Sequence, residues 1–272
     1  MGSLFNNLQQ AMILDPHSDG IQVEKHFAVC NGPETLAEFV EDLINTPLWA
    51  SKRCHGGNLP EACQKLAASI DAYAGSKAEP AYHSRRHFKE VCLALSLLLK
   101  SGQSLAVMDT AASVWSVNDQ NCWILLLAAV AHDFGHEGRP NRIRGELEEK
   151  ACALLDEVLG TSLSVPVGCL QTIKTLILST EPNLYTDLIK LADIAGERIC
   201  TEDVMKVLLV EADLFASMLP TYGVALGKLL AEEYSTEAPA LASLIDSAEG
   251  RQGFLKTHPS ISPNLRYFCL ND

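Results

Sequence analysis

One apolar segment, Trp123 to Ala131, is followed directly by His132 and Asp133. Nine consecutive residues of this kind are typical of a helix that is buried on all sides. An imidazole and a carboxylate at the end of a buried helix lose their hydration, which is costly unless a partner compensates for it. A metal ion is the simplest partner for both groups. The sequence therefore predicts a metal site where this helix ends.

Helical periodicity recurs along the rest of the chain, whereas the alternation typical of strands is nearly absent. We expect an all-α fold, a compact bundle of about ten helices in one structural unit. Residues 1–75 carry no motif and are expected to form a helical segment packed on a core of residues 76–272. The expected helices cover approximately residues 31–44, 63–75, 82–100, 104–115, 122–131, 145–159, 167–178, 184–194, 202–219, 223–234 and 239–248, with a loop at 51–60 and a looser C-terminus.

Composition excludes several classes of protein. The formal net charge of −13 argues against a protein that grips the nucleic-acid backbone, although a small anionic substrate remains compatible with a metal site. No apolar run approaches the roughly 18 residues of a membrane span, and the N-terminus lacks the features of a signal peptide. The nine cysteines form no CxxC pair, which favours a reduced, cytoplasmic setting.

Two pairs of histidines are spaced for a shared role. His83 and His87 are four residues apart, so on one helix they would share a face. His136 follows His132 at the same spacing and would lie on its face if the central helix continued that far. Such a pair alone is also compatible with surface or core histidines that have ordinary partners. The clusters together supply ligands that divalent metals prefer.

A further carboxylate ligand is expected later in the chain. Asp213 lies in a helical stretch that is otherwise apolar on its side, and a carboxylate there needs a partner. Asp193 is a competing candidate, and either residue is also compatible with a solvated helix face. The residue pattern alone leaves the choice between them open.

These motifs together resemble the HD-domain metallohydrolases, and within them the class I cyclic-nucleotide phosphodiesterases. Residues 82–88 resemble the family motif YHNxxHA, and residues 128–141 resemble AAxxHDxxHPGxxN, with Glu137 in place of proline. Residues 147–149 and 178–181 are similar to the family segments LEN and LATD. The resemblance covers about residues 80–260, and it implies an all-α phosphodiesterase-like fold.

The resemblance also bears on the later part of the chain. The segment around Asp193 resembles a family LADL segment that binds no metal, whereas the segment around Asp213 resembles the metal-binding CADLS. Residues 232–234 are similar to the family EEF. The family's QxGF motif has its counterpart near Phe254, where either Arg251 or, with one residue deleted, Gln252 takes the place of the glutamine; we favour Gln252.

The resemblance implies a role for each matching residue. Asp133 would also bridge to a second divalent ion held mostly by water, and Phe254 would form one side of a clamp on the nucleobase. The first metal would be Zn, Fe or Mn, and the second Mg or Mn. The implied metal ligands are His87, His132, Asp133 and Asp213; the implied catalytic residues are His83, as general acid, with His136 and Glu148; the implied substrate-binding residues are Tyr82, Asn141, Gln252 and Phe254.

The expected activity is hydrolysis of a 3′,5′-cyclic nucleotide to the 5′-monophosphate. Two divalent ions would neutralise the phosphate and lower the pKa of a bridging water, while His83 would protonate the leaving oxygen. A carboxylate such as Glu148 would hold a neighbouring histidine in the required tautomer. The alternatives are another HD-domain phosphohydrolase, an HD-type diiron oxygenase that needs additional histidines, and a binding module without catalysis. Only His17, His26, His55 and His258 lie outside the motifs.

Overall fold

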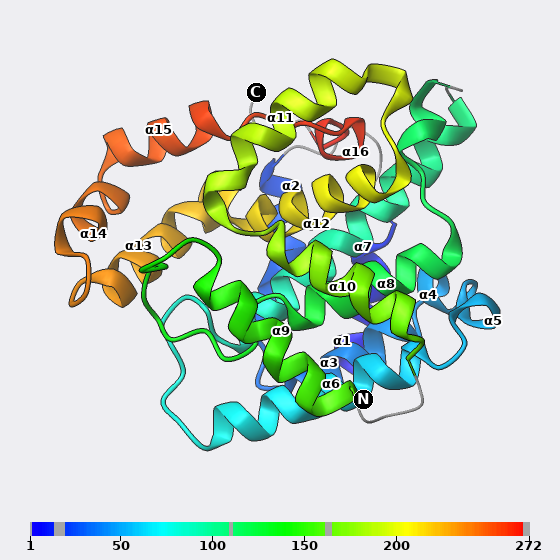
Figure 1. Cartoon of the computed structure of the whole chain (residues 1–272), viewed down its shortest axis with the longest axis horizontal. Coiled ribbons are helices and arrows are strands. Elements are labelled where there is room, and N and C mark those ends of the chain that lie inside the picture. Colours follow the sequence, from blue (N-terminus) through cyan, green and yellow to red (C-terminus); the bar gives the residue numbers. More distant parts are fainter. Residues whose placement is uncertain (1, 14–19, 109–110, 161–164, 269–272) are drawn as a thin grey trace.

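The computed structural model describes residues 2–13, 20–108, 111–160 and 165–268, in which all regular structure is helical. The expectation of an all-α fold is confirmed (Figure 1). His17 and Cys269 lie outside the described residues. The α-helices are α1 Gly2–Ala11, α2 Gly20–Phe27, α3 Leu36–Ile44, α4 Pro47–Ala50, α5 Arg53–Gly56, α6 Leu59–Gly75, α7 Arg85–Met108, α8 Asp119–Ala131, α9 Glu146–Leu159, α10 Val167–Leu178, α11 Tyr185–Ala195, α12 Thr201–Met218, α13 Tyr222–Tyr234, α14 Pro239–Ile245, α15 Ala248–Thr257 and α16 Pro263–Arg266.

Three helices, α7, α8 and α12, pack against one another at the centre of the fold. Every residue of α8 from Cys122 to Ala131 is buried, because α6 and α10 also cover it. This explains why its sequence is apolar on all sides. Asn118 begins the helix by accepting a hydrogen bond from the backbone N–H of Asn121. The three central helices bring their polar residues to one place.

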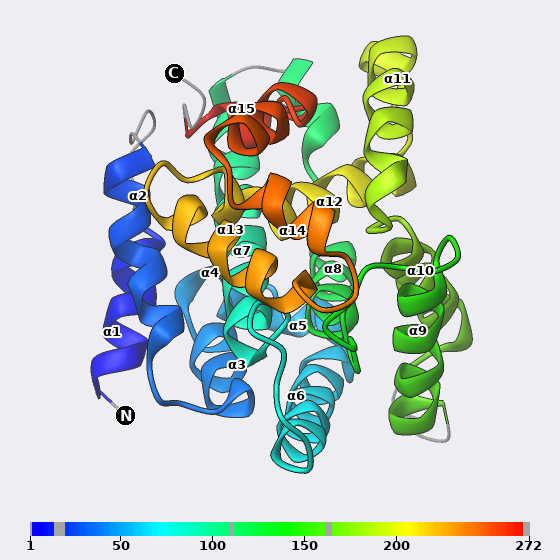
Figure 2. The same cartoon turned by 90° about the vertical axis from the view of Figure 1, so that its left-hand side faces the viewer.

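The N-terminal segment shares the core of the molecule. Helix α3 packs against α6 and α7, and α1 packs against α2 and α3. Buried side chains from Leu4 to Phe268 form one continuous cluster. Figure 2 shows α1 and α2 along one edge of the molecule and α9 and α10 along the opposite edge.

Two helices begin later than the sequence pattern predicted. Helix α3 starts at Leu36, because Thr35 and Glu38 form a capping box there. Helix α7 starts at Arg85, so His83 precedes it and the expectation that His83 and His87 share one helix face is wrong. The expected loop at 51–60 contains short helix α5 and the start of α6, and the expected C-terminal coil contains α15 and α16.

Helix α7 meets the length and composition requirements of a membrane span, contrary to the expectation from the sequence. The bent pair of α12 and α13 meets them together, with an angle of 98° between the two helices. Helix α7 is largely buried, and α3, α8, α12 and α16 pack around it. Core packing therefore accounts for its apolar composition.

Helices α13, α14 and α15 extend to one side of the bundle (Figure 1). The bend after α12 directs α13 away from the core, and α14 packs on α13. Helix α14 buries only Ala242, and α15 buries no residue. This part of the chain is therefore less tightly packed than the centre.

Candidate active site

Four side chains from the central helices converge on one point. His87 lies in the first turn of α7, His132 caps the end of α8 with Asp133 directly after it, and Asp213 lies on α12. One ligand atom from each lies within 4.8 Å of every other. The sequence predicted this set, and the structure brings it together from three helices.

The nitrogen and oxygen atoms of these four side chains lie at separations that suit ligands of one shared cation. The Nε2 atoms of His87 and His132 lie 3.2 Å apart. Asp133 Oδ2 lies 3.3 and 3.1 Å from these two nitrogens, and Asp213 Oδ1 lies 3.1 and 3.6 Å from them. His132 Nδ1 donates a hydrogen bond to the carbonyl of Ala129 at 2.9 Å, which leaves the Nε2 lone pair free to bind a metal.

The charges in this group also suit a divalent ion. Burial disfavours charge on His132, but the negative charges of Asp133 and Asp213 and their hydrogen bonds with the ring together outweigh it and raise the His132 pKa to about 10. Burial disfavours charge on Asp213 too, but hydrogen bonds with the two histidines lower its pKa to about 2. Without a metal the carboxylates thus hold protons on the imidazoles. A cation with the same donors would replace those protons.

A glycine redirects the chain after Asp133. Gly135 has a φ of 78°, and a Cβ there would lie 2.4 Å from Leu154 Cδ1. The chain therefore leaves the helical path, and His136 does not continue the helix face of His132 as the spacing had suggested. Instead the His136 ring stacks on His83, with 3.5 Å between the centroids.

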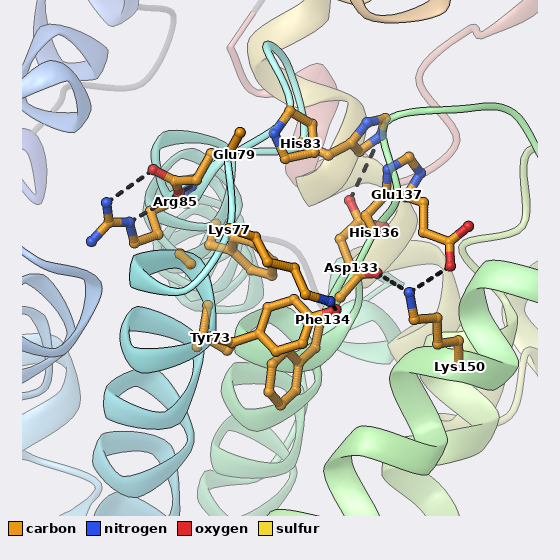
Figure 3. Close-up of a pocket in the computed structure, with 16 residues that line it drawn as sticks. Tyr73, Lys77, Glu79, His83, Arg85, Asp133, Phe134, His136, Glu137 and Lys150 are labelled. Atoms are coloured by element: carbon orange, nitrogen blue, oxygen red, sulfur yellow. Dashed lines mark hydrogen bonds and ion pairs between the residues drawn. The ribbon is translucent and has the colours of Figure 1, made fainter. Parts of the chain in front are cut away.

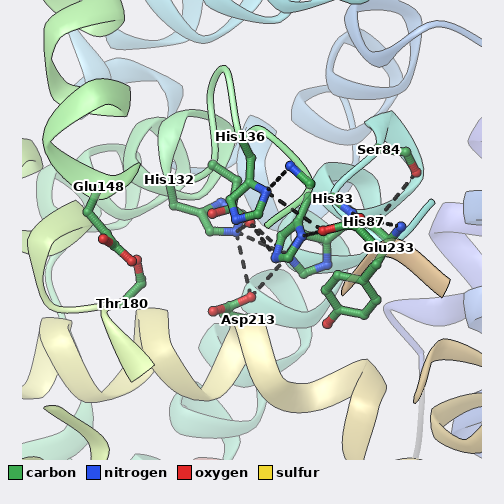
Figure 4. Close-up of polar contacts among 12 residues, drawn as sticks. His83, Ser84, His87, His132, His136, Glu148, Thr180, Asp213 and Glu233 are labelled. Carbon is green, nitrogen blue, oxygen red and sulfur yellow. Dashed lines mark hydrogen bonds and ion pairs between the residues drawn. The ribbon is translucent and has the colours of Figure 1, made fainter. Parts of the chain in front are cut away.

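His83 is held by a carboxylate that the sequence analysis did not select. Glu233 Oε1 accepts a hydrogen bond from His83 Nδ1 at 2.5 Å, and its Oε2 accepts from the backbone N–H groups of Tyr82 and His83 at 2.8 and 3.0 Å. Burial opposes the Glu233 charge, but these bonds lower its pKa, so it stays ionised. Figure 4 shows Glu233 beside His83. The similarity of residues 232–234 to the family segment EEF was the signal available in the sequence.

The other nitrogen of His83 faces the metal ligands. His83 Nε2 lies 3.9 Å from Asp133 Oδ2. His136 Nδ1 accepts the backbone N–H of Gly138 at 3.1 Å, and burial together with the nearby His83 lowers the His136 pKa to about 3. His136 is therefore neutral near pH 7. Of the stacked pair, His83 is the histidine positioned to carry a proton.

Glu148 lies on the side of His132 away from His83, near Thr180 (Figure 4). Its carboxylate accepts hydrogen bonds from Asn141 Nδ2 at 2.9 and 3.3 Å, and Asn141 Oδ1 accepts the backbone N–H of Leu147. Burial raises the pKa of Glu148. The carboxylate in contact with His83 is thus Glu233, whereas Glu148 pairs with Asn141. The roles expected for Glu148 and Asn141 stay predictions.

One cavity of about 390 Å³ opens beside His83, Asp133 and His136 (Figure 3). Tyr73 and Phe134 form an edge-to-face pair in its wall. At its rim, Glu137 accepts hydrogen bonds from Lys150 and Arg139, both at 2.8 Å, and these bonds lower its pKa. Glu137, which stands where the family has proline, therefore fixes the loop after Asp133 through ion pairs.

A second cavity, of about 440 Å³, lies between α12, α13, α14 and α15. Tyr82 separates it from the metal ligands: its hydroxyl lies 3.0 Å from Ser217 Oγ, and its ring centroid lies 4.8 Å from that of His87. Gln252 and the half-buried Phe254 line the same cavity. The structure thus places Gln252 and Phe254 in one cavity with Tyr82, and of the three Tyr82 contacts the histidine cluster.

Arg251 also lines this cavity, but its guanidinium group is occupied. It donates to the carbonyls of Ser217, Met218 and Leu219 at the end of α12, the last two at 3.1 and 2.9 Å. The carbonyls at a helix C-terminus lack the intrahelical partners of the helix interior, although that of Leu219 also accepts the backbone N–H of Gly223, and a cation suits their partial negative charge. Of the two residues considered for the glutamine position, Arg251 therefore has a structural task.

The remaining candidates lie elsewhere. Asp193 is exposed on α11. His55 pairs with Asp119 at 3.0 Å, and His258 Nδ1 donates to the carbonyl of Phe254 at 2.9 Å. Among the described residues, the two groups able to hold a metal are the quartet above and the set of His83, His136 and Glu233, so neither His55 nor His258 supplies an additional ligand.

Comparison with known proteins supports the fold. No protein-family model matches the sequence, and no curated protein matches it. Among solved structures, Leishmania PDEB1 in complex with IBMX has a TM-score of 0.57 at 17% identity, covering 92% of this chain and 83% of that chain. The phosphodiesterase domain of the RhoPDE fusion protein from the choanoflagellate Salpingoeca rosetta has a TM-score of 0.58 at 14% identity, covering 99% and 93%. A second structure of the rhodopsin phosphodiesterase domain from that organism has a TM-score of 0.55 at 16% identity, covering 94% and 88%. The expected phosphodiesterase-like fold is thus confirmed.

Proposed function

We propose that this chain is a metal-dependent phosphodiesterase that hydrolyses a 3′,5′-cyclic nucleotide to the 5′-monophosphate. The observation that carries the proposal is the position of His83. Its Nε2 points toward the metal-ligand quartet, 3.9 Å from Asp133, while its Nδ1 is held by Glu233. A proton donor beside a cation site is the arrangement that phosphodiester hydrolysis requires. The likeness in fold to phosphodiesterase domains supports the proposal.

The quartet fits a divalent metal because it offers two imidazole nitrogens and two carboxylate oxygens within 4.8 Å of one another. Zn, Fe or Mn suits this donor set. Asp133 would also help to hold a second ion, for which Mg or Mn is suited. When bound, divalent ions neutralise the charge of the phosphate and lower the pKa of water.

His83 would supply the proton that the leaving group needs. Water adds its oxygen to phosphorus, the P–O3′ bond breaks, and the departing O3′ takes the proton from His83 Nε2. The ionised Glu233 stabilises the protonated imidazole and fixes its orientation. One proton of the attacking water returns the imidazole to its protonated form, so the single product is the 5′-monophosphate with a free 3′-hydroxyl.

The organic part of the substrate would occupy the cavity of about 440 Å³ next to Tyr82. Phe254 would pack on the base, and Gln252 would hydrogen-bond to its edge. The three carbonyl partners of the Arg251 guanidinium favour Gln252 over Arg251 for this contact. Such a cavity, mostly apolar with a few polar groups, is typical of sites for small organic ligands.

Turnover tests this function directly. The purified protein is incubated with cAMP, cGMP and bis(p-nitrophenyl) phosphate in the presence of Mn²⁺ or Mg²⁺, and 5′-monophosphate or nitrophenol is measured. Release from at least one diester is expected. Failure with all three removes the proposal. Turnover of phosphomonoesters alone selects another phosphohydrolase, and two bound irons with oxygen consumption select an oxygenase.

The variant His83→Ala separates chemistry from metal binding. It should lower kcat by about 100-fold or more, which is the usual contribution of a general acid, while the metal content stays unchanged. Loss of metal in this variant would show that His83 is a ligand.

A further inference from the structure

One ring nitrogen of His87, Nδ1, is buried without a hydrogen-bond partner among the described residues. The His87 side chain is only 1% exposed. Glu90 lies one turn further along α7, is equally buried, and its Oε2 also lacks a partner among the described residues. The two atoms are 3.8 Å apart. A buried donor and a buried acceptor left unpaired each cost about 1–3 kcal/mol, so their juxtaposition calls for an explanation.

The other oxygen of Glu90 is firmly held. Its Oε1 accepts a hydrogen bond from the Tyr222 hydroxyl at 2.6 Å and lies 3.1 Å from Arg86 Nε. Arg86, one turn earlier on the same helix, balances the negative charge. The carboxylate is therefore anchored through one oxygen, and its second oxygen is presented toward His87.

We propose that Glu90 is the positioning residue of the metal ligand His87, and that Tyr222 holds Glu90 in place. A small shift of the imidazole toward Oε2 would let Nδ1–H donate to it. This would fix the tautomer in which the Nε2 lone pair faces Asp133 and Asp213. Carboxylates paired in this way with a metal-bound histidine orient the ring and raise its basicity. The inference rests on the metal site of the proposed function, but its test requires no turnover.

Tyr222 is itself held in position by residues of the N-terminal segment. Glu24 on α2 accepts hydrogen bonds from the backbone N–H groups of Thr221 and Tyr222, the second at 2.8 Å. It thereby caps the start of α13 and complements the helix dipole. Phe27 packs on the Tyr222 ring with 6.0 Å between centroids. Contacts with helix α2 thus help to fix the position of the Tyr222 side chain.

Helix α13 also reaches the site at its other end, because Glu233 holds His83 there. One helix consequently positions a metal ligand through Tyr222 and Glu90, and the proton donor through Glu233. This gives the N-terminal segment, which carries no motif of its own, a defined task.

Cobalt titration of the metal-free protein tests the inference. The dissociation constant for Co²⁺ and the visible absorption of the bound ion are measured for wild type, Glu90→Gln, Glu90→Ala and Tyr222→Phe. The expected loss in affinity is about 10–100-fold for Glu90→Ala, with an altered absorption band, and smaller for Glu90→Gln, whose carbonyl oxygen still accepts a hydrogen bond. Tyr222→Phe should also weaken binding.

The matched control is Tyr185→Phe. Tyr185 is buried and its hydroxyl also donates one hydrogen bond at 2.6 Å, to the carbonyl of Pro259. Its loss should leave the Co²⁺ affinity unchanged. Circular dichroism identifies any variant that does not fold, in which case Glu90→Gln and Tyr222→Phe decide. Wild-type affinity and absorption in those two variants overturn the inference. The proposed function fails by a different result, namely metal-loaded wild type without diesterase activity.

Discussion

His83 Nδ1 and Glu233 Oε1 lie 2.5 Å apart although 150 residues separate them in the sequence. The same carboxylate accepts the backbone N–H groups of Tyr82 and His83. Glu233 therefore fixes both the ring and the backbone of the proposed general acid.

Replacing Glu233 by glutamine should lower kcat without removing the metal. The amide carries no charge to stabilise the imidazolium, and we expect a decrease in kcat of about 10–100-fold, part of the contribution of general acid catalysis. Steady-state kinetics and metal analysis check this together. Glu232→Gln, at the exposed neighbouring position, is the control. Equal kcat values for the two variants would contradict the role of Glu233.

Replacing Asp213 by alanine should remove the metal, because one of the four converging ligands is lost. The loss in affinity should exceed the roughly 100-fold that removal of a ligand's supporting partner costs. Asp193→Ala, on the exposed side of α11, should retain both metal and activity. Metal analysis after dialysis distinguishes the two. Loss of metal from Asp193→Ala instead would place the site elsewhere.

Metal affinity should rise with pH. Burial opposes charge on His132, but Asp133 and Asp213 together raise its pKa to about 10, and hydrogen bonds with the same two carboxylates help to raise the pKa of His87. Both imidazoles must lose their protons to bind a cation, so each displaced proton should strengthen binding by about tenfold per pH unit below these pKa values. Calorimetry in buffers of different ionisation enthalpy measures the released protons. An affinity that does not change between pH 6 and 8 would exclude this linkage.

Glu211 should make the metal-free protein more stable as the pH falls from 8 to 5.5. Burial raises its pKa from 4.5 to about 7, against hydrogen bonds from Ser262 and Ile261. The folded protein then binds a proton that the unfolded chain lacks between these two pKa values, which adds about 2 kcal/mol to the free energy of unfolding over this interval. In urea unfolding with EDTA, the change in the free energy of unfolding between pH 8 and pH 5.5 should be more stabilising in wild type than in Glu211→Gln by this amount, and an equal change in both would contradict the assignment.

Alanine variants of Gln252 and Arg251 should differ in their effects: one should change substrate binding and the other the stability of the protein. Gln252→Ala should raise KM for the cyclic nucleotide by about 3–10-fold, the worth of one hydrogen bond, and leave the melting temperature unchanged. Arg251→Ala should instead lower the melting temperature by several degrees, because three carbonyls at the end of α12 each lose a hydrogen bond from the guanidinium. The reverse pattern would assign the base contact to Arg251.

The helical class and the metal-binding pair His132 and Asp133 could be predicted from the residue pattern for a physical reason, whereas the choice of Asp213 over Asp193 rested on the family resemblance. The spacing of apolar residues indicates which helix faces are buried. Ionisable side chains at the end of a buried helix are costly without a partner, so they are usually there for a function. The turn containing His83 could not be predicted, because distant groups determine it. Glu79 accepts the backbone N–H of Arg85 at 2.9 Å, and Glu233 accepts those of Tyr82 and His83. Because of these hydrogen bonds, α7 begins at Arg85 and not at Tyr82, where the local pattern had placed its start.

The partners of the histidines were also beyond local sequence reasoning. Glu148 was a reasonable choice for the tautomer-fixing carboxylate, since it follows the His132 motif closely. The structure instead brings Glu233 to His83 from α13, and Glu90 to His87 from within α7. Glu90 is a partial exception, because it follows His87 by three residues on one helix, a spacing at which two side chains can meet. The bend between α12 and α13, which directs the path of α13, has no such signal.

The four ligands come from three helices, and in an unfolded chain they would be far apart. A cation that binds them binds the folded chain alone, and so draws the folding equilibrium toward the native state. At a free metal concentration 100 times the dissociation constant this amounts to about 2.7 kcal/mol, a large part of the stability of an ordinary domain. Metal supply would then govern how long this protein survives proteases as well as how fast it works.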